Sequence, residues 1–292
     1  MSANILTKKI MKEINQIIHL TNSMDRLKSI LKNGFYTSYA KENFGDKNIL
    51  IPMISFANIL FRDIGEREVI NYGNYGIVFD REHIIEKFNL NPVFYVKNGS
   101  ELENIFVQNL QISIIPQILH KAKEFYKQTK KEKFSDYIEL NPISEEEKKL
   151  LDTLDSDVND DFIHSVKIIF EKYFVNTMQQ VLLLKPYKIE DKQNETKIAY
   201  NEREWRKSFL DLNYISEIKP TGEKNNEYEK WIKTPKPHFA NKYILNFEPS
   251  DVKFIYVENQ KEVLEIEKFI RDNLKSEIEV YTLNYLKLRE NK

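Results

Sequence analysis

The stretch Tyr200-Asn201-Glu202-Arg203-Glu204-Trp205-Arg206 places two carboxylates, two guanidinium groups and one of the two tryptophans within seven residues. Because side chains alternate along a β-strand, a strand here would turn Glu202, Glu204 and Arg206 to one face and Trp205 to the other. On that face Arg206 favours the ionised form of Glu204, whereas Glu202 disfavours it. Such a carboxylate could stabilise a developing cation. The other interpretation is a cross-strand ion-pair ladder on a solvated sheet, with Trp205 covering the core.

A strand followed by a capped helix is predicted near the N-terminus. The apolar run at residues 17–21 indicates a buried strand that carries His19 and Thr21 on one face. Residues 22–34 combine a capping residue, helical spacing of Leu and Ile, and a terminal glycine, which predict a short helix. His19 would therefore lie just before a helix N-terminus, where backbone N–H groups are free. It is either a buried histidine bonded to the backbone or a ligand-binding residue.

Tyr72 and Tyr75 each precede a glycine, in a chain that has only 7 glycines. Glycine lets the backbone turn sharply or approach a ligand closely. The two tyrosines are either turn aromatics packed on the sheet or rings that face a ligand. Residues 77–79 and 93–96 are predicted strands, and residues 80–88 are a predicted helix.

Hydrophobic spacing divides the chain into a mixed core and an insertion. Apolar residues recur with the helical period over residues 100–180, whereas both flanking parts mix predicted strands and helices. We therefore predict an α+β fold with the N-terminal half of its core at residues 1–99, a large helical insertion at residues 100–180 and the C-terminal half at residues 181–292. Residues 3–16 are a predicted helix and residues 278–286 a predicted strand.

The composition limits the classes of function. Lys and Arg number 44 against 45 Asp and Glu in 292 residues, a balance that gives no support for non-specific nucleic-acid binding. With no cysteine, the chain has no disulfide, thiolate nucleophile or zinc–sulfur site, which is compatible with the cytoplasm. No apolar run approaches the ~18–20 residues that span a bilayer, and the N-terminus lacks the features of a secretory signal.

The motifs do not indicate a metal site. The five histidines lack the spacing of metal ligands. Residues 155–159 begin like a calcium-binding EF-hand loop, but Asp160 stands where that pattern requires glycine and Val166 where it requires glutamate. We therefore expect a solvated loop there and no bound metal.

Several motifs, taken in order, resemble the AbiGi family of bacterial abortive-infection proteins. They include His19-Leu20-Thr21, Tyr72-Gly73-Asn74-Tyr75-Gly76-Ile77, Lys185-Pro186-Tyr187 and the stretch at 202–206, within a resemblance that spans about residues 17–270. The resemblance implies a cytoplasmic anti-phage protein of the antitoxin type. A cognate toxin or antitoxin protein would be its partner.

A more distant similarity, to DarT-like ADP-ribosyltransferases that modify DNA, implies an NAD-binding cleft within an ADP-ribosyltransferase-like core. By that likeness His19 would bind the ribose or carboxamide of NAD, supported by Thr21. Tyr72 or Tyr75 would stack on the nicotinamide, and Arg206 belongs to the same cofactor-binding set.

The same likeness implies a catalytic role for Glu204, with Glu202 as the second choice. This carboxylate would hold the ribose and stabilise an oxocarbenium-like transition state. ADP-ribose would pass to an unknown acceptor. A nucleic acid is possible as a partner only if it is this acceptor. The spacing of the Tyr-Gly pairs and the large insertion depart from those enzymes.

Two hypotheses follow, together with a third that the balanced charge disfavours. In the first the protein transfers ADP-ribose from NAD or consumes NAD. In the second the fold serves as a non-enzymatic antitoxin that holds a partner toxin with its surface. The third, a nuclease or nucleic-acid reader, lacks both a basic footprint and a metal motif.

Overall fold

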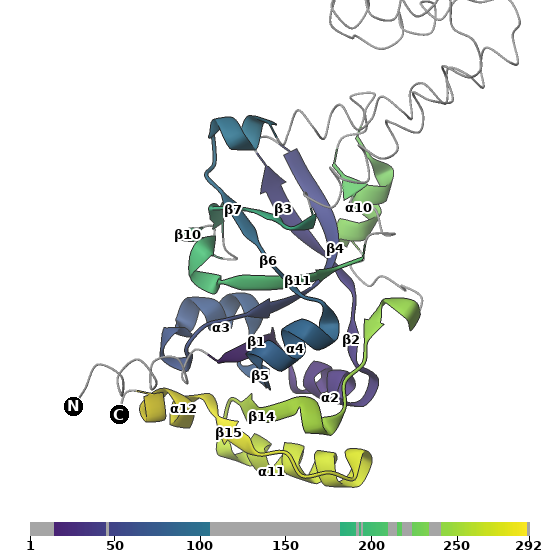
Figure 1. Ribbon diagram of the computed structural model, residues 1–292, viewed down its shortest axis with the longest axis vertical. Helices are drawn as coiled ribbons and strands as arrows, with labels where there is room; N and C mark the ends of the chain where they lie inside the picture. Colours follow the sequence, from purple (N-terminus) through teal and green to yellow (C-terminus); the bar gives the residue numbers. More distant parts are fainter. Residues whose placement is uncertain are drawn as a thin grey trace, which may run out of the picture.

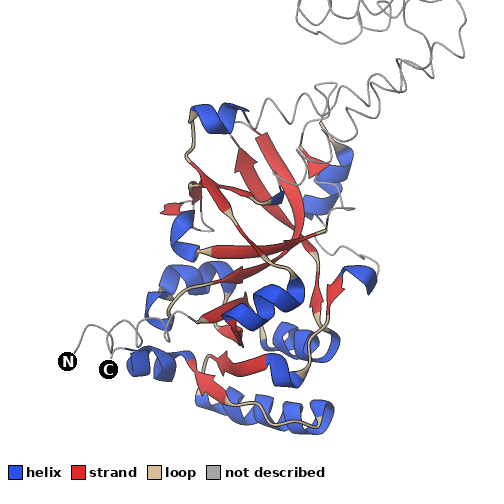
Figure 2. Ribbon diagram, viewed as in Figure 1, coloured by secondary structure: helices blue, strands red, loops and turns tan. Residues whose placement is uncertain are grey.

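The computed structural model (Figures 1 and 2) describes residues 15–44, 47–105, 182–190, 193, 195–209, 215–217, 224–233 and 241–290. The helix predicted at 3–16 lies outside these ranges except for its last two residues. Of the predicted insertion at 100–180, only residues 100–105 are described, and residues 101–105 form a helical turn. The division of the chain at residues 99 and 180 stays a prediction.

A mixed sheet organises the described residues, which confirms the α+β class. Seven strands follow the order β15-β14-β5-β1-β4-β11-β6, and β3 and β12 also pair with β4. The ladders are antiparallel apart from β14–β15, which is parallel. The strands are β1 (Gln16–Thr21), β3 (Ser38–Phe44), β4 (Lys47–Ala57), β5 (Tyr75–Asp80), β6 (Asn91–Pro92), β11 (Glu204–Ser208), β12 (Ile215–Ser216), β14 (Val252–Val257) and β15 (Val280–Thr282).

Three short strand pairs and the helices complete the described fold. The pairs are β2 (Phe35–Tyr36) with β13 (Ile244–Leu245), β7 (Phe94–Val96) with β8 (Leu184–Pro186), and β9 (Lys188–Glu190) with β10 (Thr196–Ile198). The α-helices are α2 (Met24–Asn33), α3 (Glu66–Tyr72), α4 (Arg81–Phe88), α10 (Asn226–Lys233), α11 (Gln260–Phe269) and α12 (Leu283–Glu290). A π-helical turn, Ile270–Leu274, extends α11, and 3₁₀ turns lie at η1 (Phe61–Asp63), η2 (Ala199–Glu202), η3 (Asn241–Tyr243) and η4 (Pro249–Asp251).

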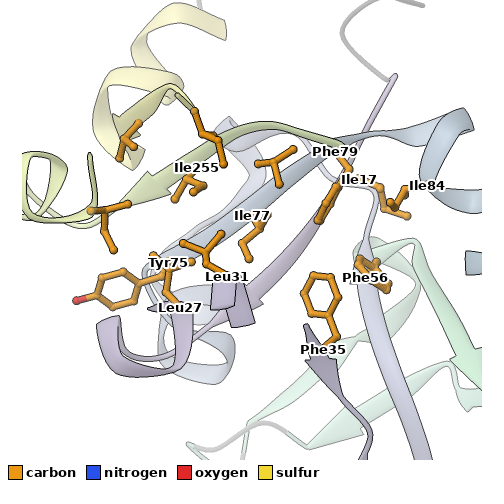
Figure 3. Close-up of a cluster of buried hydrophobic side chains, with 14 of the residues drawn as sticks. Ile17, Leu27, Leu31, Phe35, Phe56, Tyr75, Ile77, Phe79, Ile84 and Ile255 are labelled. Carbon is orange, nitrogen blue, oxygen red and sulfur yellow. The ribbon is translucent and has the colours of Figure 1, made fainter. Parts of the chain in front are cut away.

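Apolar side chains cover both faces of the central strands, as their near-continuous apolar sequences require. On one face, Ile17 and Ile77 pack with residues of α2, α4 and α11 in the largest buried cluster (Figure 3). On the other face, Ile18 and Val78 pack with residues of η1 and α12. The core therefore lies on both sides of β1 and β5.

The predicted strand–helix unit near the N-terminus is confirmed. β1 runs from Gln16 to Thr21, and the Ser23 side chain caps α2 by accepting a hydrogen bond from the Arg26 N–H. Gly34 ends the helix at φ 80°, a conformation that favours glycine. The helix predicted at 80–88 is also confirmed, with Asp80 as its capping residue.

Two predicted strands are wrong in their extent. Residues 199–202 form the 3₁₀ turn η2, Arg203 takes a left-handed conformation at φ 44°, and β11 starts only at Glu204. Glu202 therefore cannot share a strand face with Glu204. Near the C-terminus, β15 covers only Val280–Thr282 of the strand predicted at 278–286, and α12 follows it.

β1 and β4 are joined by a single residue pair, Ile18 with Ala57. On either side of that pair, side chains replace the missing ladder bonds. The Asn58 amide donates to the Gln16 carbonyl at 2.6 Å, and His19 Nδ1 bonds to the Ser55 carbonyl at 2.9 Å. These contacts satisfy backbone carbonyls that would otherwise lose their partners where the strands separate.

Candidate functional site: a buried charge cluster beside a polar pocket

Arg206 lies at the centre of a buried group of charged side chains. Its place on β11, two residues from Glu204, turns both side chains to the same face of the sheet. Arg206 Nε donates to Glu204 Oε1 at 2.7 Å, and Nη1 donates to the Leu184 carbonyl at 2.9 Å. Nη2 contacts the carboxylate of Glu42 on β3. The Arg206 side chain has no exposed surface, so all of its charge is met within the protein.

Two lysines extend this group toward η2. Lys185 Nζ on β8 donates to Glu202 at 2.7 Å and to Glu204 at 2.6 Å. Lys197 Nζ on β10 donates to Glu202 at 2.5 Å and to the Tyr72 hydroxyl at 3.1 Å. We call the six charged residues the buried charge cluster: the anions are Glu42, Glu202 and Glu204, and the cations are Lys185, Lys197 and Arg206. Their formal charges balance, as buried charges require.

The cations lower the pKa of two of the three carboxylates. Burial raises the pKa of Glu204, but Arg206 and Lys185 outweigh burial and hold that pKa well below its ordinary 4.5. The pKa of Glu202 is likewise lowered, because Lys185 and Lys197 outweigh the effect of burial. For Glu42 burial prevails over the nearby cations and raises the pKa.

Burial lowers the pKa of Lys185 in turn, but Glu204 and Glu202 raise it well above its ordinary value. The cluster therefore holds ionised side chains at neutral pH.

The alternative prediction for residues 200–206, an ion-pair ladder that faces solvent, is wrong because the ion pairs are buried. The ion pairs exist, but the side chains of Glu204 and Arg206 are 7% and 0% exposed. Trp205 does point to the opposite face, where it packs against the main core, and the Arg81 guanidinium lies 5.7 Å from its ring centre. Charge and aromatic content in the stretch were visible in the sequence, whereas its burial was not.

His19 is held as a neutral ring with a defined proton position. The Ser55 carbonyl can only accept a hydrogen bond, so Nδ1 carries the proton and Nε2 is left as an acceptor. Burial lowers the His19 pKa to about 4, although the bond to Ser55 acts in the opposite direction. The ring packs 4.6 Å from Phe35 and 5.5 Å from Phe56, centre to centre.

A pocket of about 440 Å³ lies at the C-terminal end of β1 and brings three of the candidate residues together. His19, Thr21 and Tyr72 line it. The complete lining consists of these three with Leu20, Asn22, Arg26, Ser29, Ile30, Phe35, Tyr36, Ser38 and Asn71. No residue of this lining carries a carboxylate.

Ser55 and Tyr72 connect the pocket with the buried charge cluster. The Ser55 carbonyl accepts from His19, and its hydroxyl donates to Glu204 Oε1 at 2.7 Å. Tyr72 lines the pocket, and its hydroxyl donates to Glu202. Glu202, Glu204 and Arg206 thus lie behind the pocket wall and not among the residues that line it.

Tyr75 pairs with Thr21 between β5 and β1 but does not line the pocket. Its hydroxyl donates to Glu262 Oε1 on α11 at 2.8 Å, and its ring belongs to the main core cluster. In Figure 3 the ring points away from Phe35 and Phe56, the two rings that contact His19. Of the two tyrosines considered, only Tyr72 shares the pocket with His19.

Sequence reasoning did not single out Glu42, Lys185 and Lys197 as members of this site. One signal was present: Lys185 follows an apolar run at residues 181–184, and a charged residue in such a run is unusual unless it is paired. No comparable local signal marks Glu42, whose partner Arg206 lies 164 residues further along the chain.

The described residues hold no group of three or more His, Asp or Glu side chains that could bind a metal ion. Within the same residues, none of the helices is both long and apolar enough to cross a bilayer.

A family model matches most of the chain. The family model described as "Putative abortive phage resistance protein AbiGi, antitoxin" matches residues 33–258. The match includes the whole buried charge cluster and Tyr72, and it begins after β1, which carries His19 and Thr21. No curated protein and no solved structure matches the chain.

Proposed function

Because the chain belongs to the AbiGi family, we propose that it is the antitoxin of an abortive phage-resistance system and neutralises a cognate toxin by binding it. The observation that carries this proposal is the family match over residues 33–258. In this view the surface of the protein, and not a cleft, carries the function.

The hydrogen bonds of Glu204 support a binding protein over an enzyme. Its carboxylate accepts from Ser55, Lys185 and Arg206, all at 2.6–2.7 Å. A carboxylate engaged in this way has little capacity left for a substrate, and losing it would leave two buried cations short of a partner. Its role is then to hold β11 against β4 and β8.

Co-expression tests this function. The toxin of the same system, expressed alone, should arrest growth, and this chain should relieve the arrest and purify with the toxin. His19→Ala and Tyr72→Phe should leave both results unchanged, because neither the pocket nor its chemistry is needed for binding. An arrest that persists in the presence of the folded protein would rule the antitoxin role out. Loss of neutralisation in a His19→Ala variant that keeps its melting temperature would instead contradict the view that the pocket takes no part in toxin binding.

A second candidate function is transfer of ADP-ribose from NAD by an ADP-ribosyltransferase-like core. The observation that favours it is the shared pocket of His19, Thr21 and Tyr72. His19 would bind the ribose or carboxamide of NAD, Thr21 would support it, and Tyr72 would stack on the nicotinamide.

Glu204, or Glu202 in its place, would hold the ribose and stabilise positive charge as the bond to nicotinamide breaks. Help of this kind is worth several kcal/mol. For this role the Glu204 carboxylate has to turn away from Lys185 and Arg206 and toward the pocket. Ser55, which bonds both Glu204 and His19, connects the two places.

NAD turnover by the purified protein tests the second candidate. We expect release of nicotinamide by the parent chain, a large loss in Glu204→Gln, and none in Glu262→Gln, whose carboxylate bonds Tyr75 outside the pocket. The melting temperature of each variant separates lost chemistry from lost folding. If the parent neither binds nor turns over NAD with any protein or nucleic-acid acceptor tried, this candidate is rejected.

A further inference from the structure

The pocket beside His19 is lined by several polar side chains. Its volume of about 440 Å³ falls in the range of small-molecule sites, which are mostly apolar with a few placed polar groups. Here five of the lining residues carry a neutral hydroxyl or amide in addition to the two tyrosines: Thr21, Asn22, Ser29, Ser38 and Asn71. Such a lining suits a ligand rich in hydrogen-bonding groups.

Arg26 supplies the only formal charge of this lining. Behind Tyr72 lies the buried charge cluster, whose three anions and three cations balance. Arg26 makes no ion pair within the described part of the chain and is exposed. The pocket therefore presents one unneutralised guanidinium, a group whose planar fork of donors fits the oxygens of a phosphate.

α2 places Arg26 for this role. Arg26, Ser29 and Ile30 stand three and four residues apart, so a single face of the helix borders the pocket. Leu27 and Leu31, on the buried face, fix the helix against the core. The guanidinium is therefore carried by an anchored element and not by a loop.

Aromatic rings in the lining offer a flat surface on which a planar group of the ligand could pack. Tyr36 lines the pocket and is 53% exposed, although a large aromatic side chain is normally covered where the fold allows it. Tyr72 and His19 add two further rings. His19 Nε2 has no hydrogen-bond partner among the described residues, and as an acceptor it can receive a ring N–H or a sugar hydroxyl.

We infer that this pocket binds a small molecule that joins a planar ring to a phosphate group, of which a nucleoside monophosphate is the simplest example. Arg26 would hold the phosphate, Tyr36 would cover the ring, and His19 would accept a hydrogen bond from the same ligand. This binding needs no carboxylate and no bond cleavage, so it does not depend on ADP-ribose transfer. It also goes beyond toxin neutralisation, because it gives the antitoxin a site for a small molecule.

Calorimetric titration of the full chain with AMP, adenosine and inorganic phosphate tests the inference. AMP should bind saturably and raise the melting temperature, and both adenosine and phosphate should bind at least about tenfold more weakly, since each lacks one of the two recognised groups. Arg26→Gln should weaken AMP binding about tenfold or more and leave adenosine binding unchanged. Arg62→Gln, at an exposed arginine outside the pocket, is the matched control and should bind AMP like the parent.

A second pair of variants tests the ring contact. Tyr36→Leu should weaken AMP and adenosine binding alike, and Tyr285→Leu, at a tyrosine of similar exposure on α12, should weaken neither. The inference is overturned if none of the three probes binds saturably. It is also overturned if Arg26→Gln binds AMP as the parent does. Toxin neutralisation is scored separately, so failure of one proposal leaves the other standing.

Discussion

Replacing Arg206 by Met probes the buried charge cluster at its centre. The guanidinium is fully buried and contacts Glu42, Glu204 and the Leu184 carbonyl. Removing one member of a buried ion pair costs ~3–5 kcal/mol, because the remaining charge stays out of water without its partner. Lys185 still neutralises Glu204 in the variant, so the main unpaired charge is that of Glu42.

Glu42 also limits the size of the effect. Burial already raises the pKa of Glu42, and without Arg206 that carboxyl can take up a proton instead of remaining a bare charge. We therefore expect the free energy of unfolding to fall by ~3 kcal/mol, the lower end of the range for buried pairs. That is a factor of roughly 100 in the folding equilibrium.

Urea unfolding followed by circular dichroism measures this loss. Arg67→Met is the matched control, because Arg67 pairs with Glu195 at the surface, where the two side chains are 39% and 59% exposed. An exposed pair is worth ~0.2–1 kcal/mol. If Arg206→Met loses no more stability than Arg67→Met, the cluster does not hold the fold and the reasoning is refuted.

A double variant, Glu42→Leu with Arg206→Met, supplies an independent check. It removes both charges of one pair, and apolar replacement of a whole buried pair is often neutral or stabilising. The double variant should therefore be more stable than Arg206→Met alone. A further loss of stability on adding Glu42→Leu contradicts the assignment of Glu42 as the unpaired charge.

Three other predictions concern His19, Glu204 and Gly73. Because burial lowers the His19 pKa to about 4, nitrogen NMR should show a neutral ring with its proton on Nδ1 at pH 6. A ring that titrates near 6.5 contradicts the effect of burial, and a neutral ring with its proton on Nε2 contradicts the hydrogen bond to the Ser55 carbonyl. The pKa of Glu204 in the folded protein lies below its ordinary 4.5. The stability that this carboxylate contributes is therefore present above pH 4.5 and is lost as the pH falls below 4.5. Between those conditions the melting temperature should fall less steeply with decreasing pH in Glu204→Gln than in the parent. Gly73→Ala should cost at least ~2 kcal/mol in urea unfolding, because φ is 104° and the added Cβ would lie 2.2 Å from the Thr21 carbonyl oxygen. Gly99→Ala, at φ 71° with open space around it, should cost only ~1 kcal/mol, and equal losses would sink the steric argument.

The N-terminal unit shows what could be predicted from the sequence. Apolar residues at 17–18, a capping Ser23 and a terminal Gly34 predicted a strand and a helix, and β1 and α2 confirm both. These signals act within a few residues of one another, through hydrogen bonds and backbone conformations that neighbouring side chains decide. The structure places His19, Thr21 and Tyr72 in one pocket, and their role in binding a ligand stays a prediction.

The 200–206 stretch shows where sequence reasoning failed. Its composition drew attention to Glu204 and Arg206, but its alternation suggested a strand that begins too early and a surface that faces water. The left-handed backbone of Arg203 breaks the alternation, and no residue type at that position announces it. Tyr75, selected on the same ground as Tyr72, packs in the main core cluster and does not line the pocket.

By itself the sequence determined the strand and helix of the N-terminal unit and the helix that follows Asp80, the balance of charge, and the crowding of carboxylates and guanidinium groups in one stretch. Only the tertiary structure decided that these charges are buried and with which partners they pair. Arg206 meets Glu42 across 164 positions of sequence, and Ser55 meets Glu204 across 149. The reason is physical: helix caps and side-chain periods depend on neighbours along the chain, whereas the partner of a buried charge depends on which strands lie side by side and in what register.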